Sequence, residues 1–358
     1  MKIVFIDDEN TGCYYVRTKV YADELKRLGH EVLVANGKDM PDNLLDYDVF
    51  CFNRTGEGNF TLAFDYLRMN GKVISYDTDD AIELVEPTNV VYHQARSLLQ
   101  NYYYMLNETH VITTTTETLG NTLATHTPRP IYVFPNCINV DEWKERPKEN
   151  KKLRIGFAGS NSHISDVIPM IEGIIQLQEE IDFDFYMFGM SMNHSTLKDW
   201  ANENYNKIQN PKHPFYKAML ELEAKCKKIK NFHWIQAVKI GEYRYKLSEL
   251  DFDIGLAPVL DTKFNRNKSE LKLLEYAMVG TPCIGSNNKP YTGTPTVLVE
   301  NNPKAWYNGI KELAINKELR EKIAQEQKDW VLKNRDIKLW GHQRIKLYES
   351  LINDKAII

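Results

Sequence analysis

The chain has 358 residues, which exceeds the size that one hydrophobic core usually serves, so we expect two domains. Hydrophobic residues make up 42% of it and charged residues 26%, as in an ordinary globular protein. The formal net charge of -4 predicts no general affinity for polyanions. The five scattered cysteines form no Cys-x-x-Cys pair, which argues against a disulfide framework or a zinc site.

The first residues, MKIVFIDDEN, lack the long apolar core of a secretion signal, and no apolar run is long enough to span a bilayer. We therefore expect a cytoplasmic protein with free thiols. Charge is divided unevenly along the chain: residues 1–145 hold 12 Lys and Arg against 22 Asp and Glu, and the remainder holds 33 against 27. Chance variation is one explanation. The other is two domains with different ligands, the second suited to an anion.

Residues 1–145 alternate short apolar runs with segments of helical spacing. We predict strands at 2–6, 31–35, 47–52, 72–76, 110–115 and 130–136, and helices at 16–30, 60–70 and 91–106. Such alternation implies parallel pairing with helical crossovers, and hence a Rossmann-like domain.

A charged, proline-containing segment at 143–152 is the best linker candidate, and the pattern then begins again. We predict strands at 153–159, 183–189, 232–236, 252–258 and 281–286, and helices at 167–180, 242–250 and 269–278. A polar insert at 190–230 interrupts this second Rossmann-like unit, and amphipathic helices end the chain. We expect domains at 1–145 and 152–328, facing each other across a cleft in which ligands bind at the carboxyl ends of strands.

The segment 264–286, FNRNKSELKLLEYAMVGTPCIGS, carries the strongest chemical signal. We expect a helix that begins at Ser269, whose free N–H groups from Ser269 through Glu270 to Leu271 hold phosphate oxygens. Arg266 and Lys268 precede that terminus and can neutralise a diphosphate. Glu275, two turns further in, can accept hydrogen bonds from ribose hydroxyls. An amphipathic helix with solvated charges would give the same pattern.

Two other turns contain candidate ligand-binding groups. The glycine-rich turn GFAGSNSH, which follows a predicted strand, lets the backbone approach a phosphate. After the fourth predicted strand, SYDTDD places three carboxylates together. A magnesium site is one option there, but no matching acids recur at a recognisable spacing. A solvated acidic turn is another.

The segment 264–286 resembles the signature of retaining GT-B glycosyltransferases of the large family 4 group. Glu275 matches the second Glu of their Glu-x7-Glu motif, and Gly280-Thr281-Pro282 matches the following turn. Asn267 occupies the position of the first Glu, which in the family faces the transferred sugar. A branch with the form FNR-x-KS-x-LK-x-LEY fits more closely. FPNCI, at 134–138, resembles the element that ends the family's first domain.

The resemblance implies two Rossmann-like domains, with residues 329–358 packing back on the first. It also implies metal-independent transfer of a sugar, with retention, from a nucleotide diphosphate sugar to a hydroxyl acceptor such as a glycan, lipid or natural product. No other cofactor is expected. The candidate residues are, as catalytic groups, Asp77, Asp79, Arg266 and Lys268; as donor-binding groups, Gly12, Gly159, Ser160, Asn161, His163, Asn267, Ser269, Glu270, Leu271 and Glu275; and as acceptor-binding groups, Tyr14, Arg17 and Asp80.

Two alternatives remain. A DNA-modifying glycosyltransferase that acts on hydroxymethylated bases would use the lysine-rich insert to meet a phosphate backbone, against which the acidic first domain argues. A non-catalytic nucleotide-sugar-binding protein would explain Asn267 and the absence of the family's Arg and Lys pair near His163.

Overall fold

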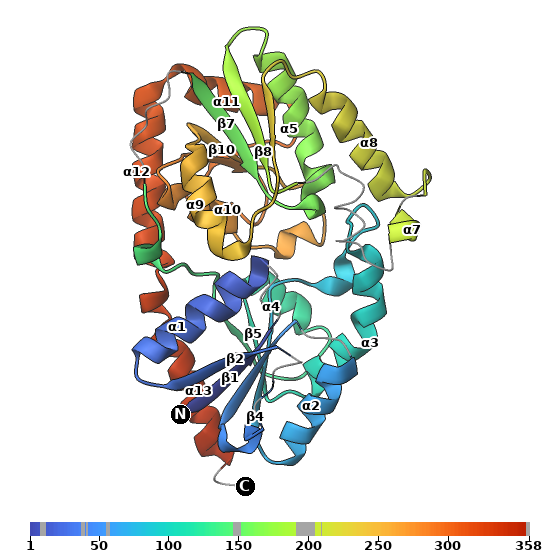
Figure 1. Cartoon of the computed structure of the whole chain (residues 1–358), viewed down its shortest axis with the longest axis vertical. Coiled ribbons are helices and arrows are strands. Elements are labelled where there is room, and N and C mark those ends of the chain that lie inside the picture. Colours follow the sequence, from blue (N-terminus) through green and yellow to red (C-terminus); the bar gives the residue numbers. More distant parts are fainter. Residues whose placement is uncertain are drawn as a thin grey trace.

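The computed structural model describes residues 1–7, 12–36, 40, 42–54, 58–145, 152–190, 205–208 and 210–355. The chain forms two lobes, one above the other, each built around a parallel sheet with helices on both faces (Figure 1). Both termini lie at the lower lobe, which is the first domain (Figure 1).

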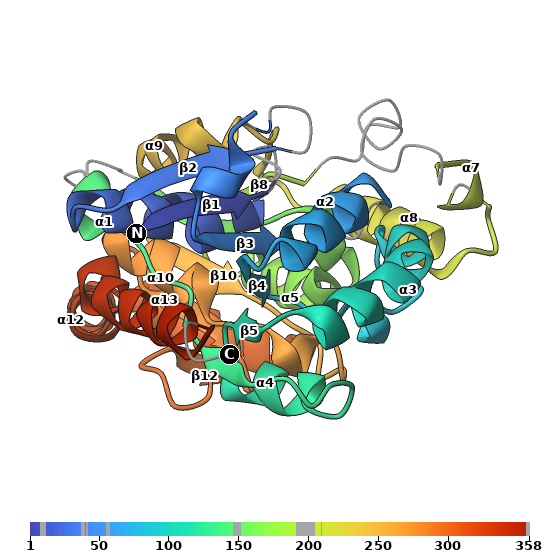
Figure 2. The same cartoon turned by 90° about the horizontal axis from the view of Figure 1, so that it is seen from below.

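The first domain has a six-stranded sheet with the order β2-β1-β3-β4-β5-β6. Its strands are β1 (Lys2–Ile6), β2 (Glu31–Ala35), β3 (Val49–Asn53), β4 (Val73–Thr78), β5 (Val111–Thr114) and β6 (Ile131–Val133). Its helices are a π-helix (Tyr14–Lys19) continuing into α1 (Val20–Arg27), then α2 (Gly58–Met69), α3 (Tyr92–Glu108) and α4 (Glu117–Leu123). Figure 2 shows α2 and α3 on one side of this sheet and α1 on the other. Every residue of β3, β4 and β5 is buried, as expected for strands covered on both faces.

The second domain has a six-stranded sheet with the order β12-β11-β10-β7-β8-β9. Its strands are β7 (Leu153–Ala158), β8 (Phe183–Phe188), β9 (Phe232–Ile235), β10 (Ile254–Ala257), β11 (Cys283–Ser286) and β12 (Val297–Val299). Its helices are α5 (Ile164–Leu177), α7 (Tyr205–Ile208), α8 (Pro214–Cys226), α9 (Ile240–Leu250), α10 (Leu271–Met278) and α11 (Pro303–Ile315). This strand order is that of a dinucleotide-binding Rossmann sheet, whose connections diverge between β7 and β10.

The last two helices connect the domains. Helix α12 (Lys317–Asn334) packs against α10 in the second domain, and α13 (Gly341–Lys355) packs against α1 in the first. Ile337, Ile345 and Tyr348 belong to the same buried cluster as residues of β1 and α1. Figure 1 shows α12 along one side of the upper lobe and α13 against the lower one. The expected return crossing is thus present.

Most predicted elements lie within a few residues of the observed ones, with a few differences. The short strand β12, the helices α4 and α7 and the π-helical form of Tyr14–Lys19 were not predicted, and α10 begins at Leu271 instead of Ser269. Parts of the expected linker (146–151) and insert (191–204 and 209) lie outside the described residues. Within the described ranges, no helix combines the length and apolarity needed to cross a membrane.

Candidate functional site

The carboxyl edge of the second sheet is the place where this topology opens a crevice. After β7 the chain turns at Gly159 into a 3-10 helix (Asn161–His163) and α5; after β10 it runs through a second 3-10 helix (Asn265–Asn267) into α10. Because these connections leave two neighbouring strands toward opposite faces, their turns line a ligand-binding crevice in sheets of this order. The predicted donor turn and the predicted donor helix are therefore brought together.

Lys272, to which the sequence assigned no role in binding, reaches from α10 to the turn after β7. Its Nζ donates to the carbonyl oxygen of Ala158 at 2.6 Å and lies 5.1 Å from the centre of the Phe157 ring. A Cβ atom at Gly159 would lie only 2.9 Å from that Nζ, so the glycine lets the ammonium reach the turn. Burial lowers the pKa of Lys272, Glu275 opposes this shift, and the charge of Lys268 adds to it. A bound anion would relieve this cost.

His163 lies beside the two lysines as a neutral imidazole. Its Nδ1 is 2.8 Å from an Asp166 carboxylate oxygen, which makes Nδ1 the protonated nitrogen and leaves Nε2 as an acceptor. Burial, followed by the charge of Lys268, lowers the pKa of His163 to about 4. The Lys268 ammonium itself lies 4.7 Å from the centre of the Phe264 ring. Two ammonium groups and a neutral histidine therefore converge on the turn after β7.

Glu275 lies one turn after Lys272 on α10 and accepts a hydrogen bond of 2.9 Å from the Tyr243 hydroxyl. Burial raises the pKa of the Glu275 carboxyl, while Lys272 and the Tyr243 hydrogen bond lower it. Tyr243 comes from α9 and stacks on Phe188, at the end of β8, with 5.4 Å between ring centres. The carboxylate predicted to bind ribose thus lies beside Lys272, oriented by a tyrosine that the sequence analysis missed, and its contact with ribose stays a prediction.

The residues just before α10 are used differently from the prediction. Arg266 is exposed and forms two hydrogen bonds, of 2.6 and 2.7 Å, with the Asp261 carboxylate. Glu270 is buried and paired with Arg335 at 2.5 Å. Ser269 accepts a hydrogen bond from Asn136 at 2.8 Å, and Leu271 packs against the apolar clusters of both domains. These contacts hold the domains together and take Arg266 away from the crevice.

Asn267 also joins the domains instead of facing a ligand. Its Oδ1 accepts a hydrogen bond from Thr122 Oγ1 at 2.8 Å, and its Nδ2 donates to the carbonyl oxygen of Lys263 at 2.7 Å. Thr116 Oγ1 reaches the Asn267 carbonyl oxygen at 3.3 Å. The amide is 3% exposed, so its expected contact with a sugar is replaced by contacts with α4.

The other two donor-binding candidates in the turn after β7 are Ser160 and Asn161. Ser160 Oγ lies 2.8 Å from Ser162 Oγ. Asn161 is buried in the first position of its 3-10 helix, next to the neutral histidine. Both belong to the turn after β7, and their contact with a donor stays a prediction.

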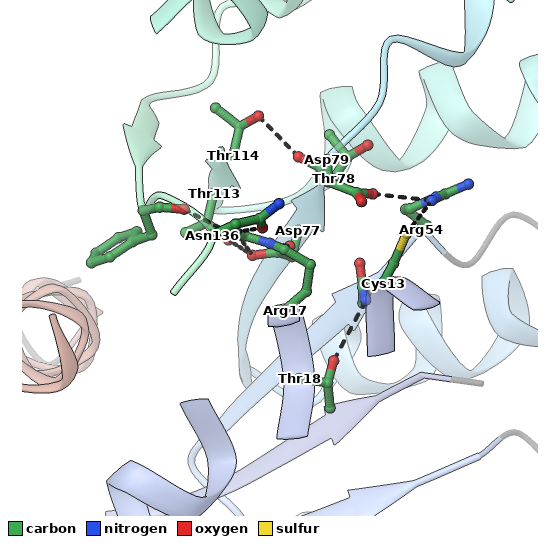
Figure 3. A network of polar contacts seen from close by, with 12 residues as sticks. Cys13, Arg17, Thr18, Arg54, Asp77, Thr78, Asp79, Thr113, Thr114 and Asn136 are labelled. Carbon is green, nitrogen blue, oxygen red and sulfur yellow. Dashed lines mark hydrogen bonds and ion pairs between the residues drawn. The ribbon is translucent and has the colours of Figure 1, made fainter. Parts of the chain in front are cut away.

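Arg17 and Asp77, expected in the cleft, form a buried ion pair in the core of the first domain (Figure 3). Arg17 makes two hydrogen bonds of 2.8 Å to the Asp77 carboxylate, and Arg344 on α13 adds a third of 3.0 Å. Burial raises the pKa of Asp77, but the charges of Arg17 and Arg344 outweigh it and keep that pKa below its usual value. With exposures of 1% each, neither Arg17 nor Asp77 can contact a ligand. Both are structural.

Asp79 and Asp80 lie at the edge of the first domain and share one cation. Arg54 is 3.1 Å from Asp79 and 3.4 Å from Asp80, and its guanidinium also contacts the Cys13 sulfur (Figure 3). Arg54 has φ of 50°, which is uncommon for a residue other than glycine. Gly12 is exposed and Tyr14 half-buried at the start of the adjacent π-helix. Asp79 and Asp80 therefore share Arg54 as a counter-charge, and the ligand-binding roles of these two residues, Gly12 and Tyr14 stay predictions.

The described residues contain no group of three or more His, Cys, Asp or Glu side chains arranged to hold a metal ion. The SYDTDD carboxylates instead bind arginines from three other segments. Their charge is balanced within the protein, which accounts for a cluster that the sequence left open as a cation site.

Sequence comparison finds no matching family model and no matching curated protein. Structure comparison does. A glycosyltransferase from Rickettsia africae ESF-5 is 13% identical with a TM-score of 0.64, and the match covers 98% of each chain. An alpha-glucosyltransferase in complex with UDP is 13% identical with a TM-score of 0.65, covering 97% of this chain and 99% of that one.

The structure of TarM is 12% identical with a TM-score of 0.56, covering 85% of this chain and 54% of its own. The alpha-glucosyltransferase also matches in a complex with UDP-glucose and DNA containing an abasic site, at 14% identity and a TM-score of 0.64. The two six-stranded parallel sheets, the crevice between them and the returning helices are common to such an architecture. This chain has a two-domain GT-B fold, as the glycosyltransferase structures that it matches do.

Proposed function

We propose that this protein is a retaining glycosyltransferase that moves a sugar from a nucleotide diphosphate sugar to a hydroxyl acceptor. The observation that carries the proposal is the convergence of Lys268, Lys272 and neutral His163 on the turn after β7, with Glu275 one turn away. The UDP and UDP-glucose present in complexes of the structural neighbours belong to the same ligand class. The fold alone leaves the chemistry open, so these side chains provide the main support.

In this proposal the diphosphate lies against the Lys268 and Lys272 ammonium groups and the backbone around Gly159. Negative charge grows on the leaving diphosphate as the glycosidic bond breaks, and cations already in place stabilise it without reorganisation. Glu275 accepts hydrogen bonds from the ribose hydroxyls. In this proposal Lys268 and Lys272 supply the positive charge at the diphosphate. The nucleotide sugar is a co-substrate.

The His163 imidazole, neutral down to a pH of about 4, offers Nε2 as an acceptor to a ligand hydroxyl. Asp79 and Asp80, held by Arg54, remain our candidates for orienting the acceptor from the first domain. Closure of the domains would exclude water and limit hydrolysis of the donor.

The test is release of nucleoside diphosphate from UDP-, GDP-, ADP- and dTDP-sugars, with the product's anomeric configuration read by NMR. We expect one donor class to be consumed with retention once a hydroxyl acceptor is supplied. A nucleotide that binds but is never released from its sugar, across acceptor extracts, would favour the non-catalytic binding protein instead.

DNA is the second acceptor class to include, because the alpha-glucosyltransferase neighbour is seen with DNA. The structure gives this reading less support. In the insert, Lys225 pairs with Glu172, Lys227 with Glu223, and Lys230 with Glu179. These three pairs neutralise part of the positive charge of the insert. Salt-dependent binding of the protein to duplex DNA, together with transfer of a sugar to hydroxymethylated bases, would favour DNA as the acceptor.

A further inference from the structure

A small polar crevice lies between the domains, next to the proposed diphosphate site. The first domain contributes Glu86, Thr88 and Asn89, from the segment before α3. The second contributes Ser162, Ser165 and Asp166, together with residues of 260–265. Its volume is about 20 Å³, room for about one water molecule.

Glu86 is the group in this crevice whose chemistry is not accounted for. Its side chain is half-buried, and within the described residues its carboxylate has no recorded hydrogen bond or ion pair. Burial, followed by the nearby charge of Asp166, raises its pKa. Asp166 by contrast is fully engaged, with His163, the Leu260 N–H and Asn265 all within 2.8 Å. Partial burial of a carboxylate is unfavourable when no cation or hydrogen-bond donor compensates it, and such carboxylates are typical of ligand-binding sites.

Ser165 gives a second indication from the opposite wall. Its Oγ is shielded from solvent and has no hydrogen-bond partner among the residues that the structure describes. Ser165 and Glu86 both line the crevice, and a hydroxyl together with a carboxylate provides the donor and the acceptor that a sugar's hydroxyls require. Two acidic side chains in the same crevice disfavour a phosphate.

The crevice is continuous with the site already described. Asp166 is hydrogen-bonded to His163, and Phe264 carries the Lys268 ammonium over its ring. A group attached to a diphosphate held by the two lysines would therefore extend toward Glu86. Because the present space has room for only about one water molecule, a sugar ring enters only when the domains move apart. Glu86 then contacts the ring when the domains close again.

We propose that Glu86 recognises the transferred sugar by accepting hydrogen bonds from its hydroxyls, making the first domain a determinant of donor-sugar specificity. This inference rests on the proposed function, because it needs a nucleotide sugar in the adjacent site. It assigns recognition of the ring to a residue that lies outside the Glu-x7-Glu segment and on the other domain.

The experiment compares each nucleotide with its sugar derivative by calorimetry, using UDP and UDP-glucose, GDP and GDP-mannose, ADP and ADP-glucose, and dTDP and dTDP-glucose. The pair that binds the wild type most tightly is then measured with Glu86→Ala, with the isosteric Glu86→Gln and with Glu31→Ala. Glu31 is an exposed residue at the opposite edge of the first sheet, where it pairs with Lys2, so it serves as the matched control.

We expect Glu86→Ala to weaken binding of the nucleotide sugar by about tenfold or more, and to leave binding of the nucleotide unchanged. Glu86→Gln should fall between it and the wild type, and Glu31→Ala should match the wild type. Unchanged nucleotide-sugar affinity in both Glu86 variants would overturn the inference and leave the proposed function intact. A wild type that binds no member of any pair would overturn both.

Discussion

Lys272 is the residue on which the proposed donor site depends most. It is half-buried, its ammonium reaches the turn at Gly159, and burial lowers its pKa. The sequence does contain a signal for it: Lys272 and Glu275 are three positions apart, on one face of a helix. We expected Arg266 and Lys268 to supply the positive charge, and Arg266 faces Asp261 instead, because charge and proximity to the helix start do not reveal which way a side chain faces.

The first prediction separates these two cations. Lys272→Met should weaken binding of the nucleoside diphosphate by about 10- to 100-fold, since it removes a charge-assisted hydrogen bond in a buried place. Arg266→Met is the matched control, and its affinity should stay near the wild-type value because Arg266 pairs with Asp261 in solvent. Calorimetric titration measures both. Equal affinities in the two variants would remove Lys272 from the site.

His163 leads to a prediction about pH. Its pKa is about 4 in the folded chain against 6.5 for the free side chain, so the unfolded chain takes up the proton first as pH falls. The stability that comes from a neutral His163 is therefore complete above pH 6.5 and is lost toward pH 4. Between pH 6.5 and pH 5 the wild type should lose about 1.5 kcal/mol relative to His163→Gln.

Urea unfolding of both proteins across this pH range measures that difference. A stability gap between wild type and His163→Gln that stays constant with pH would show that the imidazole is protonated equally in both states. It would also remove the basis for treating Nε2 as an acceptor at neutral pH.

At the scale of elements, the SYDTDD turn shows how two aspartates two positions apart have different roles. Asp77 is the last but one residue of β4 and faces the core, whereas Asp79 follows the strand and reaches Arg54 at the surface. The sequence predicted this strand but could not show that Arg17 and the distant Arg344 meet at Asp77. That meeting depends on α13 returning to the first domain.

Asp77→Asn should therefore destabilise the first domain by about 3 to 5 kcal/mol, because it leaves two buried guanidinium groups without their counter-charge. Asp46→Asn, an exposed change in the same domain, should alter stability by less than about 0.5 kcal/mol. Urea unfolding followed by tryptophan fluorescence measures both. A cost below about 1 kcal/mol for Asp77→Asn would contradict the structural role given to this network.

At the scale of the whole molecule, the alternation of strands and helices was enough to predict two Rossmann-like domains. Short apolar runs mark strands such as β1 and β7. The contacts of the residues just before α10 could not be predicted from the sequence. Ser269, Glu270 and Asn267 are adjacent to the candidate site in the sequence, yet each is bonded to Asn136, Arg335 or Thr122 in another part of the fold. Contacts between distant segments leave no local signal.

The interface between the domains contains polar contacts as well as apolar ones. Besides the Asn267 and Ser269 contacts, His93 of α3 lies 3.2 Å from His213 at the start of α8, and Phe264 packs with Val85 and Ala95. Interfaces of this kind within a chain permit relative domain motion. Such motion fits the need to open the crevice at Glu86 before a sugar ring can enter.

The central claim is that a nucleotide sugar lies with its diphosphate on Lys268 and Lys272 and its ribose on Glu275. A crystal structure of the complex, with the donor that the release assay selects, tests it most directly. The account predicts diphosphate oxygens within hydrogen-bonding distance of both ammonium groups and ribose hydroxyls on the Glu275 carboxylate. A donor bound elsewhere, with Lys272 still held by the Ala158 carbonyl oxygen and Glu275 by Tyr243 alone, would contradict it.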